Sequence, residues 1–173
     1  MPTSLYDAII PSFQQTLGAV AGLVSKAEAH CAEKKIAPAD LLQARLFEDM
    51  QPFTYQVKST VGHSIGAIEG VRSGVYKPDL APPPGSFAAL KDSIAGAIAA
   101  LGAVKAQENN GFEGRDMFFE IRDTKLPFTA ENFLLSFSLP NFYFHATTAY
   151  DILRHSGVPL GKRDFLGQMR LKT

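Results

Sequence analysis

Residues 129–157, TAENFLLSFSLPNFYFHATTAYDILRHSG, decide the fold, because their apolar positions recur with the spacing of one long amphipathic helix. Thr129 stands where a cap residue would begin this helix, and Gly157 supplies a left-handed stop at its end. Pro140 lies inside the helix and predicts a kink, since proline has no backbone N–H to donate. The sequence therefore predicts a long last helix with one weak point.

Three earlier segments show the same helical spacing. They are a first helix that ends near Lys34, a second that runs from about Pro52, capped by Asp49, to about Arg72, and a third that runs from a Ser86 cap to about Gln107. Between the second and third helices, residues 76–85 hold four prolines and predict a stiff, extended connection.

A short segment ahead of the last helix has the alternation of strands. Apolar residues alternate over 117–121 and return at 126–128, which predicts a small β-hairpin. The fold class is thus all-α, a four-helix bundle with a small β-hairpin before the last helix. We expect one domain, residues 1–173, with the tail 158–173 packed on it.

Composition excludes several classes of protein. The chain has 173 residues, 46% of them hydrophobic, and its 17 Lys and Arg balance 17 Asp and Glu. A net charge of zero provides no field that attracts polyanions, so we expect no nucleic-acid partner. The longest apolar stretch, residues 93–104, is too short to span a membrane. No secretory signal is visible and Cys31 has no second cysteine to pair with, so we expect a cytoplasmic protein.

The last helix carries an anomaly in its polar positions. Projected as a regular helix, it turns Asn141, His145 and Thr148 inward, on the same stripe as Phe137 and Phe144. Buried polar groups need partners. Two interpretations stay open: a closed network of side chains, or a site for a ligand or an ion.

Two residues of the second helix bear on this site. Gln56 lies at the margin of its apolar stripe, whereas His63 projects roughly 130° from the stripe's centre and is expected at a surface or interface. The same helix carries Gly62, Gly66 and Gly70, one every four residues, on the face opposite the apolar stripe. Glycines inside a helix cost stability, so this row predicts close packing there, as a dimer contact or a tight helix crossing, unless it is a solvated face without a role.

The last helix and the tail also resemble a known family. LPNFYFHATTAYDILRHSG at 139–157 and GKRDFLG at 161–167, with Tyr6-Asp7 and the segment from Arg45 to Pro52, resemble a bacterial family of unknown function in the DinB/YfiT-like metalloenzyme superfamily. The resemblance covers nearly the whole chain. It implies a DinB-like four-helix bundle, often dimeric, and we therefore expect a homodimer.

The resemblance also implies a candidate metal site. Metal-binding members of the superfamily use three histidines, one on the second helix and two spaced four apart on the fourth. The matching positions here are Gln56, Asn141 and His145, with His63 as a substitute seven residues after Gln56. Only His145 is a histidine at its expected place, so the site is degenerate and holds no cofactor or a single divalent metal ion, nickel or zinc.

Two functions follow from these residues. In the first, the protein is a non-catalytic small-molecule-binding protein or a structural dimer, with Gln56, Asn141, His145 and Thr148 as the ligand-binding residues. In the second, it is a metal-dependent hydrolase or thiol-transferase-like enzyme acting on a small molecule. His145 is then a metal ligand, together with Asn141, Gln56 and His63, or a general base.

Overall fold

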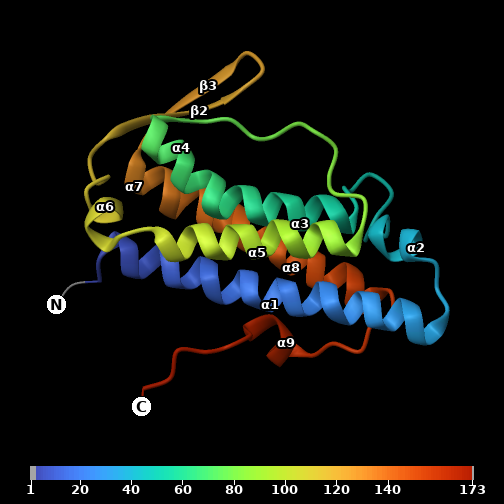
Figure 1. The fold of residues 1–173 in the computed structure, drawn as a ribbon. Helices are drawn as coiled ribbons and strands as arrows, with labels where there is room; N and C mark the ends of the chain where they lie inside the picture. Colours follow the sequence, from blue (N-terminus) through green and yellow to red (C-terminus); the bar gives the residue numbers. More distant parts are fainter. Residues whose placement is uncertain (1–2, 173) are drawn as a thin grey trace.

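The computed structural model describes residues 3–172 and is mostly helical, with a small three-stranded sheet at one end (Figure 1). Its elements, in chain order, are α1 (Leu5–Lys34), α2 (Pro38–Leu42), α3 (Phe53–Val61), the π-helix η1 (Gly62–Gly66), α4 (Ala67–Ser73), β1 (Val75–Tyr76), α5 (Phe87–Ala103), α6 (Ala106–Asn110), β2 (Asp116–Ile121), β3 (Thr124–Thr129), α7 (Ala130–Asn132), the π-helix η2 (Phe133–Ser138), α8 (Leu139–His155) and α9 (Lys162–Leu166). None of the helices in this part of the chain is long and apolar enough to cross a membrane.

The core lies between the long helices. α1 packs against α5 and α8, and α3 packs against α8 and α5. Phe13 of α1 and Phe142 of α8 meet there, with ring centroids 4.6 Å apart. Both side chains are fully buried. Such aromatic contacts hold α1 against α8, the helix that carries the inward polar residues.

Helix ends agree with the sequence in most places and differ in two. Ser86 caps α5 and accepts a hydrogen bond from the backbone N–H of Ala89, and Gly74 ends α4 with a φ of +80°. α5 ends at Ala103 rather than near Gln107, and α6 is a separate helix. Asp49 does not cap α3. Pro52 is the N-cap, and the N–H of Phe53 is instead satisfied by the carbonyl of Ala44 at 2.9 Å.

The hairpin is present and is part of a larger sheet. β2 and β3 pair antiparallel from Asp116 opposite Thr129 to Ile121 opposite Thr124. The connection after α4, expected to be extended throughout, begins with the short strand β1, and Val75 pairs in parallel with Phe118 of β2. The remaining proline-rich loop, residues 77–85, then runs back along α3 to the start of α5 (Figure 1).

Two π-helical turns change which side chains point inward. η2 ends at Ser138, two residues before Pro140, which lacks an N–H for the regular α-helical bond. A π-turn adds a residue, so every later position is rotated relative to a regular helix. Phe142, Ala146 and Ala149 are buried, whereas Phe144, which we expected to be buried, is 58% exposed.

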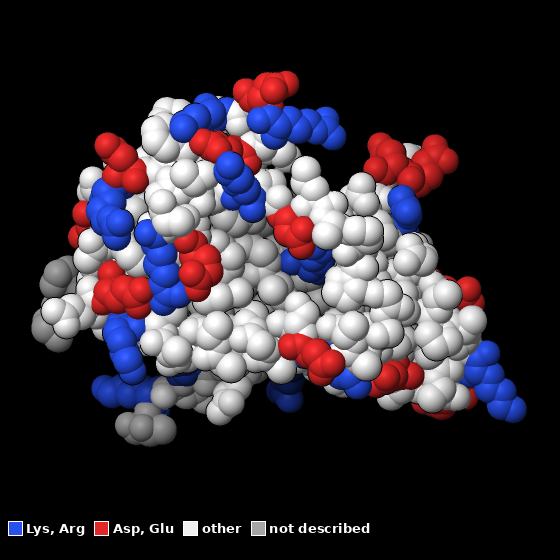
Figure 2. All heavy atoms as spheres, turned by 45° about the horizontal axis from the view of Figure 1, so that its top comes forward, with Lys and Arg blue, Asp and Glu red and all other residues white. Residues whose placement is uncertain are grey.

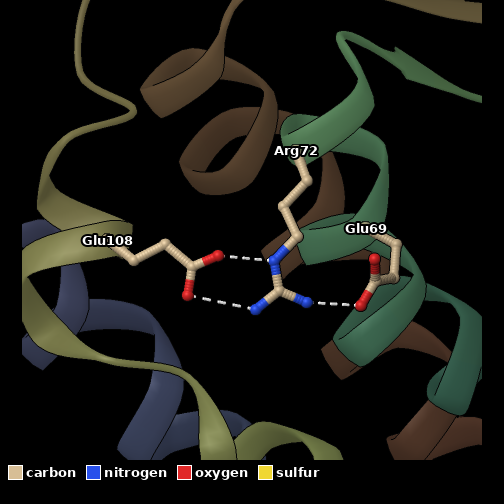
Figure 3. A network of polar contacts seen from close by, with 3 residues as sticks. All are labelled: Glu69, Arg72 and Glu108. Carbon is tan, nitrogen blue, oxygen red and sulfur yellow. Dashed lines mark hydrogen bonds and ion pairs between the residues drawn. The ribbon is translucent and has the colours of Figure 1, made fainter.

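An ion-pair network fixes α6 against α4 (Figure 3). The Nε and Nη2 atoms of Arg72 donate to the two carboxylate oxygens of Glu108, at 2.6 and 3.1 Å. Nη1 donates to Glu69 one turn earlier on α4. A two-pronged guanidinium–carboxylate contact constrains orientation as well as distance. It therefore keeps the chain between α5 and β2 close to the end of α4.

The glycine row of Gly62, Gly66 and Gly70 accommodates Tyr76. A Cβ atom added at Gly62 would lie 3.5 Å from the Tyr76 hydroxyl, and one added at Gly66 would lie 3.7 Å from the ring. At Gly70 the same atom would lie 2.7 Å from the Cβ of Tyr76 and 3.1 Å from its Cα. The close packing expected from the sequence is therefore made by a side chain of the same molecule. The homodimer stays a prediction that these glycines do not support.

We predict that Gly70→Ala destabilises the protein by about 1–3 kcal/mol, because the added methyl meets the backbone of β1. Gly96→Ala in α5 is the matched control, since nothing lies within 4 Å of the added atom. That change should stabilise the protein by up to about 1 kcal/mol, as expected for alanine inside a helix. Urea denaturation measures both. Equal effects from the two variants would show that Tyr76 does not require a glycine at position 70.

Candidate functional site

Two histidines from different helices stack against each other. His63 lies in η1 and His145 in α8, and their ring centroids are 5.8 Å apart with 14° between the ring planes. This contact corrects the prediction for His63, which we expected at a surface or interface. The projection assumed a regular α-helix, whereas His63 lies in a π-turn and packs partly buried beside α8.

Gln56 fixes the orientation and tautomer of His145. The side-chain N–H of Gln56 donates to the carbonyl of Gln51 at 2.9 Å, which leaves the amide oxygen directed at the imidazole. Nδ1 of His145 lies 2.8 Å from that oxygen and must carry the hydrogen, because an amide oxygen only accepts. Nε2 of neutral His145 therefore carries a free lone pair.

Ser138 has the corresponding role for His63. Its hydroxyl donates to the backbone carbonyl of His63 at 3.1 Å, so the oxygen is left to accept. Nδ1 of His63 lies 3.3 Å from the same oxygen and is the donor. Both imidazoles thus use Nδ1–H within the protein and keep Nε2 as an acceptor.

Burial keeps the imidazole pair, His63 and His145, uncharged. Desolvation lowers the pKa of His63 to about 4, with a smaller contribution from the neighbouring His145. Desolvation alone lowers the pKa of His145 to about 4. At neutral pH each ring is therefore a neutral hydrogen-bond acceptor rather than a cation.

The imidazole pair lines a cavity of about 400 Å³. The walls come from α3, η1 and the proline-rich loop, and Tyr76 and Ile121 contribute from the sheet. Figure 2 turns this side of the molecule forward and shows a hollow in the middle of the face, with acidic and basic side chains interspersed around it. A volume of this size is typical of cavities that hold small molecules.

Lys58 holds the proline-rich loop over the cavity. Its Nζ donates to the backbone carbonyls of Asp79, at 2.9 Å, and of Ala81, and lies 3.1 Å from the Asp79 carboxylate. The carboxylate in turn accepts the N–H of Ala81 at 2.8 Å. The Lys58 side chain is only 14% exposed, so these contacts are shielded from water.

The structure brings together some of the residues expected at the site and separates others. Gln56, His145 and His63 are in one connected group. Asn141 donates to the carbonyl of Phe137 at 2.7 Å, and Thr148 donates to that of Phe144 at 2.7 Å, so each is satisfied within its own helix. Neither lines the cavity, which corrects their expected place in a shared cluster.

Sequence reasoning missed three residues of this region. Ser138 orients His63, Lys58 holds the loop, and Tyr76 lines the cavity. The glycine row was a signal for Tyr76, since it predicted that something approaches η1 closely. No comparable signal marked Ser138 or Lys58.

The residues present do not fit the metal site that the resemblance implies. The Gln56 oxygen is bonded to His145 and the Asn141 amide to its own helix, which leaves two imidazole nitrogens as ligands. Within residues 3–172, no group of three or more His, Cys, Asp or Glu could hold a metal ion. Zinc and nickel sites in proteins usually need three or four such ligands.

Lys58→Met should free the proline-rich loop. It removes three contacts of a charged donor, so we predict about tenfold or greater acceleration of amide hydrogen exchange at Ala81, whose N–H is bonded to the Asp79 carboxylate. Lys91→Met, which removes a more exposed ion pair with Glu28, is the control and should leave the loop unchanged. Unchanged exchange in both variants would show that something other than Lys58 holds the loop.

Stability should fall as the pH is lowered from about 6.5 towards 4. In this range the unfolded histidines bind protons, whereas in the folded protein the pKa of His63 and His145 is about 4. The unfolded state thus binds more protons, and each histidine contributes a slope of about 1.4 kcal/mol per pH unit. The stability that the two neutral histidines contribute is fully present above pH 6.5, and its loss levels off below about pH 4.

Urea denaturation between pH 8 and 4.5 measures this dependence. The slope of the unfolding free energy against pH should correspond to an uptake of nearly two protons on unfolding of the native protein. In His145→Gln this uptake should fall by about one proton. His155→Gln, at an exposed position on α8, should keep the native slope. A native stability that does not change over this range would mean that the imidazoles are hydrated in the folded state.

The comparisons with known proteins show the family of the chain and agree with its fold. Residues 5–166 match the model of the family described as a domain of unknown function, DUF1993. A crystal structure of a DinB family member from Shewanella denitrificans is similar, with a TM-score of 0.80 and 29% sequence identity over 98% of this chain and 95% of that chain. No curated protein matches the chain. The chain therefore belongs to the DUF1993 family, a DinB-like family of unknown function.

Proposed function

We propose that this protein binds a small organic molecule in the cavity beneath the proline-rich loop, on a four-helix bundle of the DinB type. One observation carries the proposal: His63 and His145 stack at a cavity wall, each with Nδ1–H bonded to a fixed acceptor. Each ring therefore keeps an Nε2 lone pair for a ligand. Preformed polar groups in a cavity that also has apolar walls are typical of small-molecule sites.

The same pair is poorly suited to general-base catalysis. With a pKa of about 4, an imidazole that accepts a proton at pH 7 does so at a cost of about 4 kcal/mol. General bases work best when their pKa is near the working pH. The low pKa thus favours a role in binding, where a neutral acceptor is needed, over proton abstraction.

The metal-dependent hydrolase or thiol-transferase-like alternative has less support. It needs at least one more ligand with the donor strength of imidazole, thiolate or carboxylate beside His63 and His145. The cavity lining within the described residues includes one carboxylate, Asp79, and both of its oxygens are used by Ala81 and Lys58. A divalent ion would have to break these contacts.

Long-range ¹H–¹⁵N spectra of the imidazoles test the proposal. The spectra should show the Nδ1–H tautomer for His63 and His145. A set of uncharged heteroaromatic fragments at millimolar concentration should then shift the Nε2 signals of these two rings and leave exposed His155 unchanged. If no fragment shifts the pair, the cavity is not a binding site.

Metal analysis distinguishes the alternative. Protein purified without an affinity tag should contain less than one-tenth equivalent of zinc or nickel. Adding either metal should leave the melting temperature unchanged. Stoichiometric metal that shifts the same two imidazoles would favour the metalloenzyme instead.

A further inference from the structure

We infer that the ligand of this cavity is an uncharged molecule with a carboxamide or closely related group, which offers N–H donors and a carbonyl oxygen together. The inference rests on the proposed function and specifies its ligand. It depends on which hydrogen-bonding groups of the lining are free and which are already used.

The free acceptors are the two imidazoles. Gln56 and Ser138 occupy the Nδ1–H groups of His145 and His63, so only the Nε2 lone pairs are open to a ligand. A neutral imidazole cannot donate from that nitrogen. The ligand must therefore supply the hydrogens, as N–H or O–H groups.

Tyr76 is a free donor deep in the wall, and the hydroxyls of Tyr55, Ser59 and Ser93 in the lining also make no hydrogen bond within the described residues. The Tyr76 side chain is 5% exposed and lines the cavity, and its hydroxyl makes no hydrogen bond with any residue in the described range 3–172. Burial raises the pKa of this phenol to about 12, and nearby Tyr55 and Asp79 add to the effect. Tyr76 thus keeps its proton at neutral pH and can donate it to a carbonyl oxygen of the ligand.

The charges of the lining are already neutralised. In the described part of the chain, the charged residues at the cavity are Lys58 and Asp79. The ammonium of Lys58 has three hydrogens and three acceptors around it, two carbonyls and the Asp79 carboxylate. A carboxylate, phosphate or ammonium ligand would lose its hydration without meeting an unpaired opposite charge.

The aromatic rings of the wall stack on one another. His63 stacks on His145, and its other neighbour Tyr76 lies with its ring centroid 5.6 Å away at 30°. The His63 ring is thus stacked between two rings of the protein, so a ligand meets these side chains through their hydrogen-bonding atoms rather than by stacking on His63. A carboxamide on an aromatic ring combines N–H donors and one carbonyl acceptor, and so complements the imidazole pair and Tyr76.

Three probes of matched size test the charge of the ligand: benzamide, benzoate and benzamidine. Isothermal titration calorimetry at pH 7.5 should show that benzamide binds at least tenfold more tightly than either ion. Methyl benzoate, which keeps the carbonyl and lacks the N–H donors, should also bind more weakly than benzamide. The inference would be overturned if benzoate or benzamidine bound as tightly as benzamide, or if benzamide did not bind at 10 mM.

Variants test the named groups separately. Tyr76→Phe keeps the ring against the glycine row and removes the donor, so it should weaken benzamide by about three- to tenfold. Tyr150→Phe removes a hydroxyl outside the cavity lining and should have no effect. An equal loss in both variants would contradict the role of Tyr76.

Gln56→Glu tests the role of the imidazole directly. A carboxylate that accepts the Nδ1–H of His145 raises the pKa of this ring, so that Nε2 gains a proton and becomes a donor. Benzamide should then bind more weakly and benzoate more tightly than in the native protein. Unchanged selectivity would contradict the inference. The proposed function would still hold if heteroaromatic fragments shifted the imidazole NMR signals while benzamide bound no more tightly than benzoate or benzamidine.

Discussion

The contact between His63 and Ser138 underlies the candidate site. Ser138 lies at the last position of η2 and bonds both the backbone carbonyl and the ring of His63 in η1, so the two π-turns are joined face to face. A hydroxyl has one hydrogen, and its use on the carbonyl settles that the imidazole donates. One fully buried serine thereby fixes the position of His63 and the nitrogen that is free for a ligand.

The sheet completes the site because it brings Tyr76 against the same π-turn. β1 has only two residues, and a strand so short has little stability alone. Its parallel pairing with β2 and the close approach of Gly70 hold Tyr76 between the glycine row and Phe133. The chain that leaves β1 is the proline-rich loop, so the strand also sets where the cavity is covered. The hairpin thus helps to form the cavity, because its strand β2 holds β1 and therefore Tyr76 in place.

Much of this arrangement is predictable from the sequence, and the failures have a common cause. Helical periodicity and Gly74 located the long helices well, and Gln56 and His145 were correctly expected to lie close together. The positions of His63 and Phe144 were not predicted correctly, because a fixed rotation per residue holds only in a regular helix. Thr148 is buried as expected, but Asn141 and Thr148 bond within their own helix rather than in a shared cluster. A π-turn leaves little trace in the hydrophobic pattern before it and rotates every side chain after it.

The candidate site keeps the hydrogen-bonding geometry of a histidine metal site, but its residues offer too few ligands for a charged metal ion. Histidines that bind metals usually donate their second nitrogen to a carbonyl or carboxylate, which fixes the tautomer and directs the lone pair at the ion. The Gln56 oxygen does this for His145, at a position where the resemblance implies a ligand histidine. An amide oxygen in place of an imidazole removes one ligand and orients another. The remaining lone pairs are then too few for a transition metal but well placed for the N–H groups of a neutral molecule. On the proposed function, glutamine at position 56 and asparagine at position 141, in place of the two other histidines that the resemblance implies, change which partner the same framework can bind without a change in the fold.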